Sequence, residues 1–211
     1  MFSVLPASKL LDIQKHVEKF DIERGDTLYS YGGKSEYIYT IRKGMIKLVQ
    51  YLPEGSQRIV RLLREADIVG IEATVGTQYE HDAVALEPTE LCRYPVHSVR
   101  ELSRSDDALH HDLMGRWHRA LHEADEFVTQ LSTGSAKQRV ARLLLKLSES
   151  DESASCTLYS REDLGAILGI TTETTSRVIA EFKRKGLLIE VEGQASRFLC
   201  DRPNLDRIAS N

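Results

Sequence analysis

Glu173 and Arg177 are residues of the types that contact the edges of base pairs in DNA. They lie four positions apart, so that in a helix they share one face with Thr172 and Ser176. Arginine presents a bidentate fork to the O6 and N7 atoms of guanine, and glutamate accepts a hydrogen bond from the N4 amino group of cytosine. An acidic side chain on a face that meets phosphates is unfavourable unless it contacts a base. The alternative interpretation is an ordinary surface ion pair between Glu173 and Arg177.

A pair of short helices must position these side chains. The pattern Ser-x-x-acid at Ser160 predicts a helix start, and the helix is expected over residues 161–168. Gly169 ends this helix, because glycine tolerates the positive backbone angle of a tight turn. A threonine after the turn caps a second helix, which runs to Lys185. Two helices joined by a short turn with glycine are typical of a helix-turn-helix, whose second helix enters the major groove.

Basic residues and a hairpin follow the recognition face. Lys183 and Arg184 either contact phosphates or only complement the negative end of the helix dipole. Gly186 ends the helix, and the runs on either side of residues 192–194 predict a β-hairpin, which would form a wing. The net charge is −4, yet residues 134–211 carry slightly more basic than acidic side chains. The C-terminal segment is therefore the better place to expect a polyanion.

The first half of the chain has a β pattern. From residue 21 to residue 95, glycines separate short β-rich runs, and a helix over residues 5–20 precedes them. The predicted strands and the turn between the last two are residues 37–41, 45–51 and 58–63, with the turn at 52–56. Short strands at this spacing predict an antiparallel sandwich or jelly roll.

Between Ser105 and Thr133 the apolar residues take the spacing of a coiled coil. This spacing predicts a seam between two copies of the helix, formed by Leu113, Trp117, Ala120, Ala124, Phe127 and Leu131. A second row repeats every seven residues and is expected to face the β domain: Met114, Leu121 and Val128. The alternative is a single helix packed in a monomeric core. A further amphipathic helix is expected over residues 136–148.

The composition excludes several classes of protein. The 211 residues are 41% hydrophobic and 28% charged, which is typical of a globular chain of one or two domains. No apolar run approaches the length of a membrane span. The three separated cysteines suit neither a disulfide framework nor a closed thiolate metal site, and no nucleophile–base pair supports an enzyme. We therefore expect a cytoplasmic protein that is not an enzyme and binds no membrane.

The stretch over residues 161–177 resembles the DNA-binding signature of the CRP/FNR family of bacterial transcription regulators. The pattern Glu-x-x-Ser-Arg that ends at Arg177 is closer to the FNR branch, because Thr172 stands where CRP has an additional arginine. The segments that resemble the family's β-roll sensor domain are residues 25–28, 39–47 and 65–70. The similarity covers nearly the whole chain.

The resemblance implies an α+β fold in three parts. These are a β-roll sensor domain like those that bind cyclic nucleotides (1–104), a long dimerisation helix (105–133) and a winged helix-turn-helix (134–211). It also implies a homodimer that binds palindromes with TTGA-type half-sites and activates transcription by contacting RNA polymerase. The residues expected to contact DNA are Thr172, Glu173, Ser176, Arg177, Lys183 and Arg184.

Cyclic AMP is not the expected effector. Cyclic-nucleotide binding in the family needs an arginine followed by serine or threonine, and the matching place here is His81-Asp82. The carboxylate of Asp82 would repel a cyclic phosphate. Glu72 stands near the place of the family's ribose-binding acid, but without the arginine it is interpreted as a polar residue only.

An iron–sulfur cluster is not expected either. Such a cluster needs four cysteines, and only Cys92 stands where the FNR branch has one of its ligands. The other three ligands would belong to an N-terminal extension that this chain is expected to lack. Cys156 and Cys200 lie far from Cys92 in the sequence. Cys92 alone is interpreted as a buried small hydrophobe.

Haem is a third possibility that the histidines allow. His118 and His122 are one helical turn apart, a spacing that can ligate a metal, but with His111 they are expected on a solvated side of the long helix. His110 is expected on the seam. We expect no cofactor. The alternatives are a haem- or redox-dependent gas sensor of the same family, or a β-roll regulatory subunit that controls a protein partner.

Overall fold

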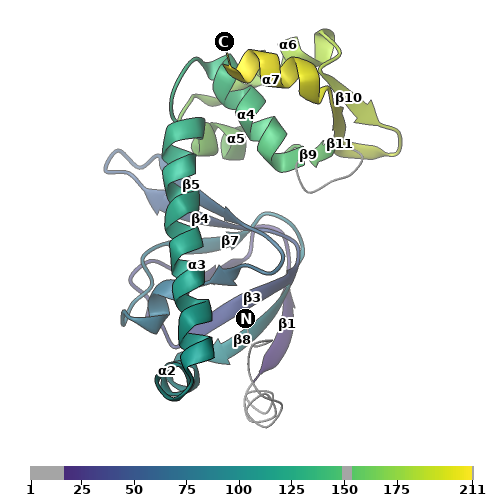
Figure 1. Ribbon diagram of the computed structural model, residues 1–211. Coiled ribbons are helices and arrows are strands. Elements are labelled where there is room, and N and C mark those ends of the chain that lie inside the picture. The colour runs from purple at the N-terminus through teal and green to yellow at the C-terminus, as the bar shows by residue number, and fades with distance from the viewer. Residues whose placement is uncertain (1–16, 149–153, 211) are drawn as a thin grey trace. The chain divides into compact units, whose positions relative to one another are not determined.

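The computed structural model describes residues 17–148 and 154–210, which form two compact units (Figure 1). The first unit ends at Ala124 and the second begins at Asp125. Helices and sheets occur in both, so the predicted α+β class is confirmed. The three-part division at residues 104 and 133 stays a prediction. In the described part of the chain, no helix is long and apolar enough to cross a membrane.

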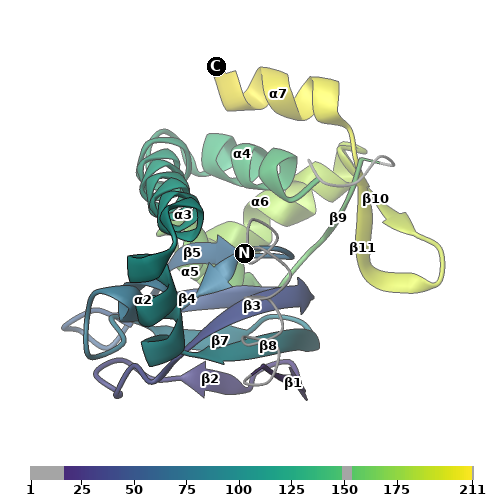
Figure 2. The ribbon, with the colours of Figure 1, turned by 60° about the horizontal axis from the view of Figure 1, so that its bottom comes forward.

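The first unit is a β-roll of two antiparallel four-stranded sheets with two helices beside them (Figure 2). One sheet has the strand order β1-β8-β3-β6 and the other has β2-β7-β4-β5. The strands are β1 (Glu18–Ile22), β2 (Thr27–Tyr29), β3 (Tyr37–Lys43), β4 (Ile46–Tyr51), β5 (Gln57–Leu63), β6 (Ile68–Val69), β7 (Asp82–Ala85) and β8 (Thr89–Pro95). A 3-10 turn, Ile71–Thr74, follows β6.

The sandwich forms because branched aliphatic residues of facing strands bury their side chains between the sheets. Ile38 of β3, Ile46 of β4 and Leu63 of β5 are almost completely buried. The backbone N–H of Leu52 donates to the carbonyl of Ser56 over 2.8 Å and closes the hairpin between β4 and β5. The three predicted strands and the predicted turn are confirmed as β3, β4, β5 and this hairpin.

The helix expected over residues 5–20 is wrong at its C-terminal end. Residues 1–16 lie outside the described residues, whereas Lys19 and Phe20 belong to β1 and pair with Cys92 and Leu91 of β8. Side chains in β1 alternate in burial, and Phe20 packs against the core of the β-roll. A period of two residues therefore replaces the helical one here.

Two helices, not one, fill the segment after the β-roll strands. Helix α2 spans Val96–Ser105, and helix α3 spans Asp107–Glu126, followed by a π-helical turn over Phe127–Leu131. The side chain of Asp106 separates the two helices, because its Oδ1 accepts from the backbone N–H of Leu109 at 3.0 Å and caps α3.

In α3, Leu113 and Trp117 of the predicted seam pack against the β-roll and not on a surface open to a second copy. Leu113 is buried in the core of the β-roll, and Trp117 packs beside it with its Nε1–H donating to Thr74 Oγ1 over 3.3 Å. The predicted seam residues Ala120, Phe127 and Leu131 are also buried, and Ala124 is half-buried. The row that stays exposed is Met114 at 45%, Leu121 at 63% and Val128 at 62%. Trp117 is the largest side chain of either row, and its indole offers the core the most apolar area.

The second unit contains a helical core and a three-stranded sheet of order β10-β11-β9. Its elements after the π-helical turn are α4 (Ala136–Ser148), β9 (Ser155–Thr157), α5 (Arg161–Leu168), α6 (Thr172–Arg184), β10 (Leu188–Val191), β11 (Gln194–Cys200) and α7 (Arg202–Ser210). The predicted bounds of α4 and α5 are confirmed. Strand β9 and helix α7 were not predicted.

Candidate nucleic-acid interface

Helix α5 begins at the residue that the sequence indicates. The Oγ of Ser160 accepts from the backbone N–H of Asp163 at 3.0 Å, and its hydroxyl donates to the Asp163 carboxylate at 2.6 Å. The cap satisfies a backbone donor that the first turn leaves without a helical partner. Leu164, Ile167 and Leu168 turn inward and are buried.

The turn between α5 and α6 depends on two glycines. Gly169 has a φ of 62°, the left-handed conformation that glycine adopts at low cost. Gly165 lies where the chain folds back, because a Cβ on it would stand 2.7 Å from the carbonyl oxygen of Ile170. The backbone N–H of Ile170 donates to the Gly165 carbonyl at 3.2 Å. These contacts fix the angle at which α6 leaves the turn.

Helix α6 is anchored by one face. Thr171 caps it by accepting from the N–H of Thr174 at 3.2 Å. Thr175 is fully buried, and its hydroxyl donates to the Thr171 carbonyl at 3.0 Å. Val178 and Phe182 continue the buried face. All six residues predicted to contact DNA are exposed on the rest of the helix: Thr172, Glu173, Ser176, Arg177, Lys183 and Arg184.

Glu173 and Arg177 share the exposed face but form no ion pair among the described residues. The Glu173 carboxylate is held at the start of the helix, where hydrogen bonds from its own backbone amide and then from Thr171 lower its pKa. Glu173 is therefore ionised at neutral pH and can only accept hydrogen bonds. The guanidinium group of Arg177 is exposed, so its N–H groups can donate to a binding partner.

The C-terminal turns of α6 carry charged side chains that contact β11 and α4. The ammonium of Lys183 lies 4.1 Å from the ring centre of Phe198 on β11, a cation–π contact that sequence reasoning did not find. Glu181 accepts from Lys137 and from Lys185, both at 2.8 Å, and these two hydrogen bonds lower its pKa to about 2. The hairpin of β10 and β11, with Gly193 at a φ of 75°, is the predicted wing (Figure 2).

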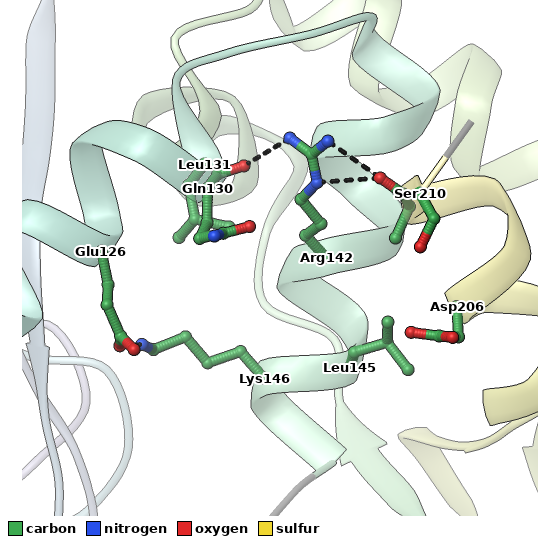
Figure 3. Close-up of a pocket in the computed structure, with 9 residues that line it drawn as sticks. Glu126, Gln130, Leu131, Arg142, Leu145, Lys146, Asp206 and Ser210 are labelled. Carbon is green, nitrogen blue, oxygen red and sulfur yellow. Dashed lines mark hydrogen bonds and ion pairs between the residues drawn. The ribbon is translucent and has the colours of Figure 1, made fainter.

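A pocket of about 480 Å³ lies among the π-helical turn, α4 and α7 of this unit (Figure 3). Arg142 spans it, donating from Nη1 to the carbonyls of Gln130 and Thr133 at 3.0 Å and from Nη2 to the carbonyl of Ala209 at 2.8 Å. Lys146 pairs with Glu126 at 3.0 Å across the same pocket. The charged groups thus hold the elements together, and sequence patterns gave no sign of this role.

His81 and Asp82, which were expected at the place of the family's phosphate-binding arginine, lie just before and at the start of β7. Asp82 Oδ1 accepts from the backbone N–H of Tyr31 at 3.0 Å. His81 is half-buried, and burial lowers its pKa. Glu72 is buried, and the Tyr29 hydroxyl lies 3.5 Å from its Oε1.

Sequence reasoning missed a charged residue close to this place, Arg61 of β5. Its Nε is buried without a hydrogen-bond partner among the described residues, and its Nη2 lies 3.6 Å from Glu123 of α3. Arg61 and Glu123 line a cavity of about 280 Å³ with Arg116 and Arg119. The cavity has charged walls of both signs.

The cysteines and histidines in the described part of the chain do not gather as metal ligands would. No group of three or more potential metal ligands occurs among residues 17–148 and 154–210. His111, His118 and His122 are exposed on α3, and His110 makes a hydrogen bond of 3.3 Å with Ser103. All three cysteines are buried and free. The structure brings Cys156 and Cys200 together, which the sequence did not predict.

Comparison with known proteins identifies both halves of the chain. A model of the cyclic nucleotide-binding domain matches residues 19–106, and a model of the Crp-like helix-turn-helix domain matches residues 138–208. The two together cover well over half of the chain.

Individual relatives are similar over most of their length. The chain is 29% identical to the transcriptional activator protein FnrA of Stutzerimonas stutzeri over 184 residues, which are 84% of this chain and 75% of that protein. The transcriptional activator protein Anr of Pseudomonas aeruginosa is 27% identical over the same shares. FixK2 from Bradyrhizobium japonicum has the same fold, with a TM-score of 0.82 at 24% identity over 91% of this chain and 96% of that one. A CRP/FNR-family regulator of Thermus thermophilus has a TM-score of 0.73 at 26% identity over 92% and 99%. With its two domains in this order, the chain belongs to the CRP/FNR family of transcription regulators.

Proposed function

We propose that this protein is a homodimeric cytoplasmic regulator that binds a two-fold symmetric DNA site with TTGA-type half-sites. The observation that carries the proposal is the exposed polar face of α6. Thr172, Glu173, Ser176 and Arg177 take no part in the packing that anchors the helix, and they occupy its first two turns. These are the turns of a recognition helix that enter the major groove.

Each residue on this face has a role that suits its chemistry. Arg177 donates two hydrogen bonds to the O6 and N7 atoms of the half-site guanine, and Glu173 accepts from the N4 amino group of a cytosine. The hydroxyls of Thr172 and Ser176 contact bases or phosphates beside them. Arg184 and Lys183 contact phosphates and so position the helix on the DNA backbone. Lys183 also keeps its contact with Phe198.

The dimer that we propose uses the exposed row of α3 in place of the row first predicted. Met114 and Leu121 are exposed on α3, on the side that the β-roll leaves uncovered, and Val128, seven residues after Leu121 in the π-helical turn, is exposed as well. Such a row buries itself best against the same row of a second copy, which gives a two-fold axis. A two-fold protein presents two recognition helices to a two-fold site, about one turn of DNA apart.

We propose that the protein activates transcription by contacting RNA polymerase. Support comes from the relatives FnrA and Anr, both of which are named transcriptional activators. We infer an effector other than cyclic AMP, because the resemblance puts Asp82 where the family has a phosphate-binding group, and its carboxylate would repel the phosphate. An iron–sulfur cluster is likewise no part of the proposal, since Cys92 is buried alone in the β-roll.

A titration of two DNA duplexes tests the proposal. Fluorescence anisotropy is measured with a TTGA palindrome and with the same duplex after the guanine of each half-site is replaced by adenine. We expect the palindrome to bind at least tenfold more tightly, because each lost bidentate contact costs about 1–3 kcal/mol. Equal affinities for the two duplexes at the same salt concentration would overturn the proposed base contacts.

A further inference from the structure

Cys156 and Cys200 place their sulfur atoms side by side inside the DNA-binding unit. The two Sγ atoms are 3.2 Å apart, although 44 residues separate them in the chain. Cys156 lies on β9 opposite Phe198 of β11, and Cys200 lies two residues further along β11. Side chains two apart on a strand point to the same face, so the two thiols meet diagonally across neighbouring strands. Both residues are buried in this unit's core.

The separation favours a covalent bond between the sulfurs over a metal between them. A disulfide needs about 2.05 Å between sulfur atoms, so the two would have to approach by little more than an ångström. Two thiolates on a tetrahedral zinc ion stand farther apart than these sulfurs do, because each Zn–S bond is about 2.3 Å long. No third ligand is grouped with them among the described residues.

The two thiols are not equivalent. The hydrogen bond between them is the largest influence on both: it lowers the pKa of Cys200 and raises that of Cys156. Burial opposes this shift and raises the pKa of Cys200, whereas Arg202, two residues later, lowers it further. Cys200 is the more exposed of the two, at 7% against 3%. The lower pKa and the nearby guanidinium of Arg202 favour Cys200 as the thiol that reacts first.

We propose that Cys156 and Cys200 form a redox modification site at which a hydroperoxide produces a reversible disulfide, and that this disulfide weakens DNA binding. The Cys200 thiolate attacks one peroxide oxygen, the O–O bond breaks, and a sulfenic acid and one water form once the displaced hydroxide takes up the thiol's proton. The Cys156 sulfur then attacks the Cys200 sulfur, the S–O bond breaks, and a second water leaves with the Cys156 proton. Two thiols lose two electrons in total, and hydrogen peroxide is reduced to two waters.

The location explains why such a bond would affect DNA binding. Strand β9 leads through Leu158 and Tyr159 to Ser160, the cap of α5, and β11 is one strand of the wing. Drawing the two strands together shifts the wing against the helix-turn-helix. The expected loss of DNA affinity rests on the proposed function, whereas formation of the disulfide does not.

Mass spectrometry and DNA titration of the same samples test the proposal. The full-length protein is treated with hydrogen peroxide, and we expect a loss of two hydrogen masses, a peptide pair that links Cys156 to Cys200, and a fall of fivefold or more in affinity for the palindrome. A thiol reductant should restore both. Cys200→Ala and Cys156→Ala should lose the response, and Cys156→Ser serves as a second variant if an alanine variant fails to fold. Cys92→Ala is the matched control and should keep the response.

Three results would overturn the inference. One is the absence of the linked peptide, with oxygen atoms added to single cysteines instead. The second is a linked protein whose DNA affinity is unchanged, and the third is a response that survives in Cys200→Ala. If reduced protein shows no preference for the palindrome, the proposed base contacts fail, but the linked peptide still tests the thiol pair.

Discussion

At the scale of single residues, α6 separates the side chains that hold it from those that are free to recognise a partner. Thr175 and Phe182 are buried to within 1% of complete burial and fix the helix, whereas Glu173 and Arg177 extend from the opposite face. Helical periodicity was sufficient to predict this division, because a period of 3.6 residues assigns each position to a face. It was not sufficient to predict the cation–π contact of Lys183, which depends on a strand formed later in the chain.

Arg177→Ala tests the base contact of one side chain. We expect affinity for the TTGA palindrome to fall at least tenfold, because about 1–3 kcal/mol is lost in each half-site. Affinity for the duplex without guanines should change little, so that the preference disappears in an anisotropy titration of both duplexes. Arg104→Ala removes an exposed arginine from α2 and is the matched control. Equal losses on both duplexes would assign Arg177 to phosphate binding instead.

Gly165→Ala tests the close contact that sets the turn. The new Cβ would stand 2.7 Å from the Ile170 carbonyl oxygen, which is backbone and cannot rotate away. We expect a loss of about 2 kcal/mol in stability, or roughly 4–8 °C in Tm by calorimetry. Gly115→Ala in α3 is the control, because its new Cβ would meet nothing within 4 Å beyond its chain neighbours and its own helix backbone, and alanine favours a helix. A Tm for Gly165→Ala as high as that of the control would refute the tight turn.

At the scale of elements, prediction from the sequence was weakest where two apolar rows on one helix have a similar spacing. Both apolar rows of α3 have coiled-coil spacing, and spacing alone cannot choose which one meets the β-roll. In the structure, Leu113 and Trp117 pack against the β-roll core, and Leu121 of the other row stays exposed. Local signals worked better: the cap at Ser160 and the positive φ of Gly169 define α5 at the predicted residues. Helix α7 went unpredicted because it has only nine residues with Leu205 and Ala209 buried, which is too short a pattern to show a helical period.

Leu121→Glu tests the exposed row as a dimer interface. A two-fold contact would place the two new carboxylates close together in an apolar seam, where burial of unpaired charge is costly. We expect sedimentation to show monomers where the unaltered protein is a dimer, with weaker binding to the palindrome. Ile189→Glu changes another exposed aliphatic residue, on β10, and should leave the dimer intact. A Leu121→Glu protein that sediments as a tight dimer would show that another surface joins the two copies.

At the scale of the whole molecule, regulation of the proposed dimer requires that an effector favour one of its arrangements over another. A ligand with equal affinity for both arrangements cannot change DNA binding, however tightly it binds. The charged cavity at Arg61 and the thiol pair at Cys156 belong to different units, so signals at the two places are separable by substitution.

Cyclic AMP should leave DNA binding unchanged. The resemblance puts the Asp82 carboxylate beside the phosphate of a cyclic nucleotide, and electrostatic repulsion between the two anions opposes the ligand. We expect the dissociation constant for the palindrome to stay within a factor of two when cyclic AMP is added at millimolar concentration. A tenfold tightening would mean that Arg61 or another cation supplies the phosphate site that the sequence did not show.

Recognition of a symmetric DNA sequence by a dimer is the central prediction, and selection from a random DNA library tests it without assuming the sequence. The unaltered protein is mixed with random duplexes, and bound DNA is recovered, amplified and sequenced over several rounds. We predict an inverted repeat whose half-sites lie about one helical turn apart and each contain a guanine, with enrichment lost for Arg177→Ala. Recovery of no common sequence, or of a single unrepeated one, would contradict recognition by a two-fold dimer.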